Sequence, residues 1–275
     1  MKTSSKLALS AVALASAAFA QTSFADEGVA YNIGVVSEYR YRGLGQTRGK
    51  PALQGGVDYD SGKGFYLGAW GSTIKWIEDQ STPGQDVKGS LELDLYGGYK
   101  FEAAGLAWDV GYLRYEYVGN KLQRTGGVNG RDGTTYKNAN TDEIYGAVSA
   151  GAFTAKYSYA ISNLFGNYNF VSNQGTKGSY YLDLSYSFDL GGGMTLVPHV
   201  GRQVIKNLTT ATTANPSYTD FALTLNKDLG RGLSASISAI GTNADKDFYT
   251  VNAATPSINY YQGKSQLVAG LKYTF

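Results

Sequence analysis

The sequence has no cysteine and a single histidine, His199, among its 275 residues. Without cysteine the chain can form no disulfide bond, so an exported protein of this composition must gain its stability from another source. One histidine and no cysteine also fall short of the ligand sets of ordinary zinc sites. The sequence therefore predicts no metal and no cofactor, and it excludes the disulfide-rich secreted scaffolds.

Long apolar runs are also lacking. The longest, Leu7 to Ala20, is shorter than the roughly 20 residues that a helix needs to cross a bilayer. Lys2 and Lys6 precede it and small residues close it, which is the pattern of a secretory signal peptide. We predict that residues 1–20 are a signal peptide, with cleavage after Ala25 as the alternative, and that residues 21–275 form a single domain.

An excess of charge is missing as well. The formal net charge of +2 includes Lys2 and Lys6, so the predicted mature chain has as many basic as acidic residues. A neutral chain gives no reason to expect a nucleic-acid partner.

Glycine and tyrosine are abundant instead, with 36 Gly and 23 Tyr, and the mean hydropathy is −0.25. This composition suits strands joined by turns better than membrane-spanning helices. Alternation of apolar and polar residues indicates twelve strands, most of which reach the ~9–11 residues of a transmembrane strand. The predicted strands are 31–42, 52–59, 65–76, 90–101, 106–118, 142–150, 154–163, 179–189, 195–205, 218–229, 233–242 and 263–275.

The connections alternate between short and long. Short turns are expected at 61–64, 102–105, 151–153, 190–193 and 230–232, and long connections at 43–50, 77–89, 119–141, 164–178, 206–217 and 243–262. Short periplasmic turns and long extracellular loops are typical of a transmembrane barrel. An even number of strands would place both chain ends on the short-turn side.

One face of the last predicted strand is apolar and ends on Phe275. Two other strands have an unclear phase. In the fifth, a one-residue bulge near Tyr112 would return Arg114 and Glu116 to the interior. In the third, two sets of residues could form the outer face. One set is Tyr66, Trp70, Ile74 and Trp76, and the other is Phe65, Leu67 and Ala69. The first set is favoured.

A soluble barrel or sandwich with its apolar face turned inward would show the same alternation. A closed sheet of twelve strands is wider than the ~8-stranded barrel whose side chains just fill its interior, so the inverted version would enclose a large apolar cavity. We therefore predict an all-β fold, a transmembrane antiparallel up-and-down β-barrel of about twelve strands.

The first three predicted strands resemble the TorF family of porin-like proteobacterial proteins of unknown function. The similar segments are 37–43, 46–47, 51–59 and 64–70. The chain departs from the family pattern at Gly45, where Ser is usual, and at Thr73, where Asn is usual. The resemblance implies an outer-membrane barrel with a transport role and names no substrate. The terminal Phe275 likewise resembles the ending of chains that the barrel-assembly machinery inserts.

Charged residues are expected on the inner face. In the first strand Tyr31, Ile33, Val35, Tyr39 and Tyr41 would face outward. The candidate pore-lining residues are Glu38, Arg40, Arg42, Asp58, Glu92, Asp94, Lys156 and Asp183. Two interpretations stay open: an eyelet with acidic and basic walls that sets selectivity, or a salt-bridged plug.

Enzyme chemistry is not expected. A barrel phospholipase would need its catalytic histidine on the outer wall, whereas His199 has the parity of the inner face. Glu92 and Asp94 share a face, but alternating acids on a lumen-facing strand arise without catalysis.

The predicted function is therefore an outer-membrane, porin-like channel for passive diffusion of small hydrophilic solutes or ions, with little charge preference. A closed barrel acting as a surface receptor, adhesin or structural protein is the alternative. The expected partners are outer-membrane lipid, small hydrophilic solutes and the barrel-assembly machinery, which would recognise the strand that ends at Phe275.

Overall fold

The computed structural model describes residues 11–12, 21–22, 27–80, 88–122, 138–169, 172–208, 215–254 and 257–275. The predicted signal peptide and both candidate cleavage positions lie almost wholly outside the described residues. Near the N-terminus only two short strands are described, β1 (Ala11–Val12) and β2 (Gln21–Thr22), which pair with each other.

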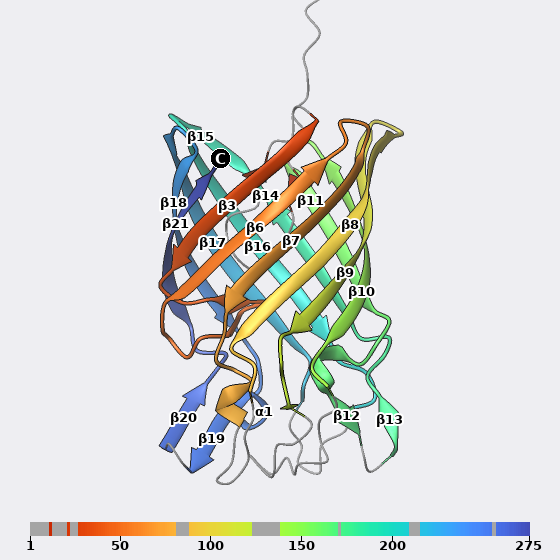
Figure 1. Cartoon of the computed structure of the whole chain (residues 1–275), viewed down its shortest axis with the longest axis vertical. Helices are drawn as coiled ribbons and strands as arrows, with labels where there is room; N and C mark the ends of the chain where they lie inside the picture. The colour runs from red at the N-terminus through yellow and green to blue at the C-terminus, as the bar shows by residue number, and fades with distance from the viewer. Residues whose placement is uncertain are drawn as a thin grey trace, which may run out of the picture.

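Twelve antiparallel strands close into a barrel (Figure 1). Each strand pairs with its neighbours along the chain, and β3 pairs with β21 to close the ring. β14 and β15 count as one strand, because both pair with β16 on either side of Ser187. The barrel strands are β3 (Gly28–Val36), β6 (Ala52–Asp60), β7 (Phe65–Thr73), β8 (Leu91–Ala103), β9 (Leu106–Tyr117), β10 (Thr141–Ala150), β11 (Phe153–Ala160), β14 (Tyr180–Tyr186) with β15 (Phe188–Gly191), β16 (Met194–Val204), β17 (Tyr218–Gly230), β18 (Leu233–Thr242) and β21 (Gln266–Thr274).

The predicted number of strands, the five short turns and the position of the chain ends are confirmed. The backbone of Tyr31 exchanges two hydrogen bonds of 2.9 Å with that of Phe275, so both ends of the barrel sequence meet at the short-turn end. Here the ring of Phe275 stacks on that of Tyr31 with centroids 5.8 Å apart. Closure leaves no free sheet edge, which gives a cysteine-free chain a source of stability.

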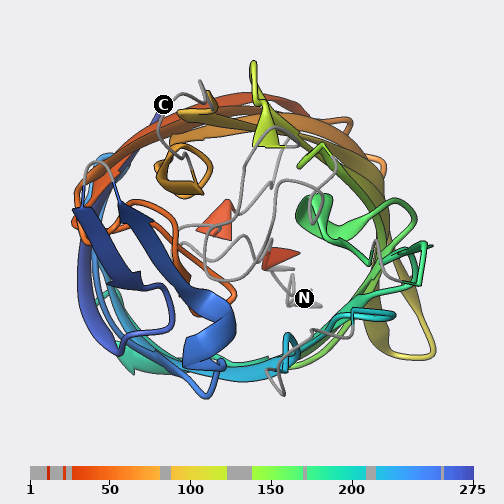
Figure 2. The same ribbon diagram turned by 90° about the horizontal axis from the view of Figure 1, so that it is seen from below.

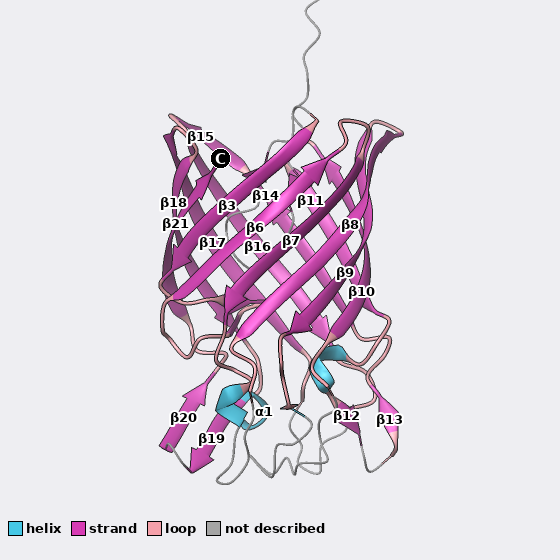
Figure 3. Cartoon of the chain, viewed as in Figure 1, coloured by secondary structure: helices cyan, strands magenta, loops and turns pink. Residues whose placement is uncertain are grey.

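Small elements gather at the long-connection end, as Figure 3 shows. Among the described residues no helix is long and apolar enough to cross a membrane. These elements are β4 (Arg40–Tyr41), β5 (Leu44–Gly45), η1 (Glu78–Gln80), η3 (Leu164–Gly166), β12 (Tyr168–Asn169), β13 (Gln174–Gly175), α1 (Lys246–Tyr249), β19 (Thr250–Ala254) and β20 (Ser257–Tyr261).

The outer surface of the barrel is apolar. Leu223 and Ile237, in the middle of β17 and β18, are each 48% exposed, while Thr224 and Ser238 between such residues are buried. Large exposed side chains continue around the ring, including Ile33, Leu53, Leu67, Leu95, Ile144, Leu182 and Leu271. A continuous apolar belt of this kind is the lipid-facing surface of a membrane barrel. The soluble alternative, with the apolar face inside, is wrong.

The favoured phase of the third strand is also wrong. Phe65 and Leu67 are exposed on the outer wall, while Tyr66 is buried inside. Trp70 and Ile74 point inward as well, because the long connections that fold into the barrel give them something to pack against. The Trp70 ring, for example, meets the Tyr39 ring edge-on at 5.6 Å.

The bulge near Tyr112 is absent. Tyr112 pairs in unbroken register with Gly97 on one side and with Ile144 on the other. Tyr115 and Tyr117 therefore occupy the interior, where they are buried. Arg114 and Glu116 face outward, which contradicts the prediction that they return to the lumen.

Candidate functional site

The segment 37–51, between β3 and β6, folds into the barrel and is called the inner loop below; Figure 2 shows it in orange within the ring of strands. It leaves the wall at Ser37, whose backbone N–H donates to Ala269 O (2.8 Å) while its Oγ accepts from Ala269 N–H (3.0 Å). The predicted first strand therefore runs too far. Tyr39 and Tyr41, which it placed on the outer wall, are buried inside at 1% and 7% exposure.

A two-residue hairpin forms the tip of the inner loop. β4 pairs with β5, and the connecting residues Arg42 and Gly43 both have positive φ, 46° and 79°. Such a turn matches the twist of the flanking strands, and glycine adopts it without strain. The tip presses on the wall at β17: a Cβ added to Gly43 would lie 2.5 Å from Cβ of Asp220.

Gly43→Ala is expected to lower the free energy of unfolding by more than Gly49→Ala. Both glycines have positive φ, which costs a residue with a Cβ about 1–2 kcal/mol, but nothing lies within 4 Å of a Cβ at Gly49. Only the first substitution adds a clash with the wall. Guanidinium titration of both variants in detergent measures the difference, and equal losses would show that the tip does not press on β17.

The guanidinium of Arg42 binds two walls of the barrel at once. It forms a bidentate pair with Glu143 on β10, with distances of 2.7 and 3.1 Å, and donates to Oε1 of Gln203 on β16 at 2.8 Å. It also lies over the Tyr181 ring, 4.4 Å from the centroid. Arg42, Tyr115, Glu143, Tyr181 and Gln203 are called the Arg42 layer below.

The Arg42 layer is dry and charged. Arg42 is 5% exposed and Glu143 is 1% exposed. Burial alone would lower the pKa of Arg42, but the adjacent Glu143 carboxylate offsets this and raises the pKa well above its ordinary value. Breaking the pair would leave a buried charge without its partner.

The base of the inner loop is closed by a second buried pair. Nε of Arg40 donates to Oε2 of Glu38 at 2.8 Å, and Oε1 of Glu38 accepts from Gly49 N–H at 2.8 Å and from the Tyr260 hydroxyl. Arg40 also donates to the carbonyl of Gln262 at 3.0 Å. Glu38 and Arg40 thus fix the inner loop in place, as in the plug interpretation.

On β8 the predicted acids lie at different depths. Glu92 accepts from the Tyr39 hydroxyl at 2.6 Å. Asp94, one inward-facing position nearer the short-turn end, is 2% exposed, and its Oδ1 has no hydrogen-bond donor among the described residues.

His199 on β16, the one histidine of the chain, lies between the carboxylates of Asp183 on β14 and Asp220 on β17. Its Nδ1 lies 3.1 Å from Oδ2 of Asp183, and its Nε2 lies 3.0 Å from Oδ1 of Asp220. Tyr181 adds a hydroxyl donor to Asp220 at 3.0 Å. His199 faces the lumen, as predicted, and its ring also meets the Tyr181 hydroxyl, 3.2 Å from Nε2.

The remaining candidates lie toward the short-turn end. Asp58 on β6 accepts from the Tyr96 hydroxyl, and the ammonium of Lys156 on β11 lies 3.9 Å from the Tyr145 centroid. Both side chains are half-buried. All eight predicted residues therefore face the interior, but only Glu38 and Arg40 pair with each other. The prediction missed Glu143, Tyr181 and Gln203. Glu143 was predictable, because successive side chains of a strand alternate and the apolar Ile144 next to it faces outward.

The interior is acid-rich rather than balanced. Among the described residues the inward acids include Glu38, Asp58, Asp60, Glu92, Asp94, Glu102, Asp109, Glu143, Asp183, Asp220 and Asp228, against the bases Arg40, Arg42, Lys100, Lys156, Lys272 and His199. The balanced lumen that the sequence analysis assumed is therefore not observed, while the charge preference itself stays a prediction.

The inward side chains are buried toward one end of the barrel only. Along β8 the inward side chains are buried at Glu92 and Asp94, half-buried at Tyr96 and Lys100, and exposed at Glu102. β17 shows the same trend, from buried Tyr218 to exposed Asp228. The exposure of the described lumen wall thus rises from the Arg42 layer toward the short-turn end.

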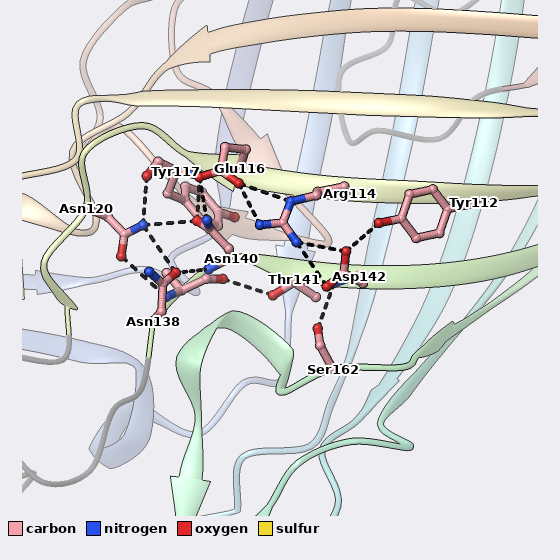
Figure 4. Close-up of polar contacts among 11 residues, drawn as sticks. Tyr112, Arg114, Glu116, Tyr117, Asn120, Asn138, Asn140, Thr141, Asp142 and Ser162 are labelled. Atoms are coloured by element: carbon pink, nitrogen blue, oxygen red, sulfur yellow. Dashed lines mark hydrogen bonds and ion pairs between the residues drawn. The ribbon is translucent and has the colours of Figure 1, made fainter.

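A separate polar cluster faces outward near the long-connection end (Figure 4). Arg114 donates to Glu116 at 2.8 Å and to Asp142 on β10 at 3.0 Å, and Asn140 donates from its amide to Glu116. Tyr112 donates its hydroxyl to Asp142 at 2.5 Å. The cluster marks the rim where the apolar belt ends, which is where tyrosines of an aromatic girdle are expected.

The chain belongs to a bacterial family described as a protein of unknown function (Gcw_chp), whose model matches residues 20–275. No curated protein sequence matches it.

Among solved structures, the NanC porin superposes with a TM-score of 0.50 at 9% identity, covering 90% of this chain and 99% of the other. The KdgM porin gives 0.48 at 7% identity, with coverages of 90% and 98%. The Acinetobacter baumannii outer membrane protein Omp33 gives 0.45 at 7% identity, with coverages of 90% and 98%. At 9% identity the NanC superposition shows the fold alone, a closed antiparallel β-barrel.

Proposed function

We propose that the protein is an outer-membrane channel for passive diffusion of small hydrophilic solutes, and that the inner loop is its gate. The closed ring with a polar, water-accessible interior supports a channel. In this proposal the conformation described here is the closed state, because the Arg42 layer and the packed inner loop lie within the lumen toward the long-connection end. Conduction requires at least part of the inner loop to move out of the lumen.

The predicted site residues divide between two roles in this proposal. Asp58, Glu92, Asp94, Lys156 and Asp183 on the wall line the path. Glu38, Arg40 and Arg42 belong to the gate. The acid-rich wall favours cations over anions, because charges in a narrow, low-dielectric passage are poorly screened.

The resemblance to the TorF family, the porin fold and the apolar belt together support insertion in the outer membrane. We propose that residues 1–20 direct export and are removed, and that the barrel-assembly machinery recognises the strand that ends at Phe275. In the folded barrel Phe275 is 65% exposed on the outer wall.

A second function has one observation in its favour. The buried Arg42 layer is the packing expected of a permanently closed barrel, which would serve as a surface receptor, adhesin or structural protein through its long loops.

Planar-bilayer recording of the purified protein under a salt gradient separates the two functions. If the protein is a channel, we expect infrequent conductance steps and a reversal potential whose sign shows that cations permeate better than anions. Recordings that stay silent in the wild type and in variants with a loosened gate would contradict the channel and support the closed barrel.

A further inference from the structure

A cavity of about 80 Å³ lies at the long-connection end, on the far side of the Arg42 layer from the water-accessible part of the lumen. Tyr41 and Gln203 lie next to or within the Arg42 layer and form part of the cavity wall. The other walls come from connections far apart in the sequence, which include η1, η3 and α1. If the barrel sits in the outer membrane, this cavity faces the outside of the cell.

The lining combines aromatic rings with primary amides and carries no charge. Trp76, Tyr117, Phe165 and Tyr249 are among its rings. Its amides are Gln46, Gln80, Asn167, Gln203 and Gln262. None of the described residues that line it has a carboxylate, ammonium or guanidinium group. The neighbouring lumen is rich in such groups, so the cavity is a chemically distinct compartment.

Several polar groups in this lining have no partner in the protein. The indole Nε1 of Trp76 is buried and finds no acceptor among the described residues. Buried N–H groups of this kind are normally hydrogen-bonded, so an orphan donor calls for a ligand or a water molecule. The side-chain amides of Gln80 and Gln262 likewise form no hydrogen bond with the rest of the described chain, although the backbone of Gln262 does.

The same groups are held in place by other contacts. The Trp76 ring meets the Tyr117 ring edge-on at 5.3 Å, and its backbone N–H donates to Gln46 O at 3.1 Å. The amide of Asn167 donates to Leu164 O at 2.8 Å, which leaves its oxygen available as an acceptor. A ligand would meet a preformed site, which lowers the entropic cost of binding.

We propose that this cavity, which is half open to solvent, binds one edge of the ring of a neutral sugar, with the rest of the sugar outside the 80 Å³ volume. A pyranose has apolar faces that pack against aromatic rings, and its hydroxyls both donate and accept, as primary amides and an indole N–H require. A charged solute would lose its hydration without gaining a counter-charge, so it is excluded. The site belongs to the outer mouth, and the inference holds whether or not the lumen conducts.

The test is calorimetric titration of the detergent-folded full chain with D-glucose and D-galactose, with D-glucuronate as the charged analogue. Saturable binding of at least one neutral sugar is expected, with glucuronate at least about tenfold weaker. Trp76→Phe keeps an aromatic ring but removes the indole N–H together with the pyrrole part of the ring, and it should weaken binding by at least about tenfold, the effect of one well-placed hydrogen bond.

Trp108→Phe is the matched control, since its Nε1 donates to Ala103 O at 3.2 Å near a short turn, and binding should stay unchanged. Gln80→Leu provides a second variant that folds independently of Trp76, because the amide it removes has no partner in the protein, and the same weakening is expected. Three results would each overturn the inference. The first is a titration that does not saturate with either neutral sugar, the second is equal affinity for glucuronate, and the third is full affinity in both cavity variants.

Discussion

Arg42→Asn is expected to turn a mostly closed barrel into a frequently conducting one. Asparagine accepts the left-handed backbone at this position, so the substitution removes the guanidinium without straining the hairpin. It breaks the contacts with Glu143 and Gln203 that join the inner loop to β10 and β16. Removing one partner of a buried ion pair costs about 3–5 kcal/mol, which would shift a closed-to-open equilibrium by roughly two to four orders of magnitude.

Single-channel recording in a planar bilayer measures the open probability. Arg231→Asn is the matched control: Arg231 also has positive φ, 55°, but lies exposed in the turn between β17 and β18. Its open probability should equal that of the wild type. Glu143→Gln, which preserves size and removes the charge from the other side of the pair, should open the barrel as Arg42→Asn does. An Arg42→Asn barrel that is folded and silent would show that the layer is a permanent wall.

Ile237→Arg is expected to destabilise the barrel in a bilayer by about 2–4 kcal/mol. Ile237 lies in the middle of β18, is 48% exposed on the outer wall, and is flanked there by Leu225 on β17 and Ala269 on β21. An arginine at this depth would place its charge in hydrocarbon, far from either interface.

Ser236→Arg is the neighbouring control at the same depth. Ser236 is half-buried and faces the lumen, where water and carboxylates are available, so its unfolding free energy should change by less than half as much. Guanidinium titration of both variants in lipid vesicles gives the comparison. Equal destabilisation, or a larger effect at Ser236, would mean that the two faces are not divided between lipid and water.

The strand order was predictable because two independent patterns agree. Residues alternate with a period of two in most strands, and glycine-rich turns such as Gly230-Arg231-Gly232 punctuate them on one side only. Both patterns are local, so they need no knowledge of tertiary contacts. The prediction failed where local alternation continued past the end of a strand. Tyr39 and Tyr41 alternate like wall residues, yet the chain had already left the wall at Ser37.

The site was predictable only as a set of charges. Alternation predicted that five charged residues lie on the inner face, and they do lie there in the structure: Asp58, Glu92, Asp94, Lys156 and Asp183. Which charges meet depends on where the inner loop folds, and that is decided by long-range contacts such as Arg42 with Glu143, 101 residues apart. The phase errors at Trp70 and Arg114 have the same origin, because interior aromatics look like lipid-facing residues when the loops that cover them are unknown.

The central claim is that lipid surrounds this barrel and water enters it. A chain without cysteine allows single-cysteine labelling at each of six successive positions, 221 to 226 of β17. Nitroxides attached there in lipid vesicles should collide more with oxygen at Phe221, Leu223 and Leu225, and more with a water-soluble nickel chelate at Ala222, Thr224 and Asn226. The account predicts this period of two with that phase, and the opposite phase or no periodicity would contradict it.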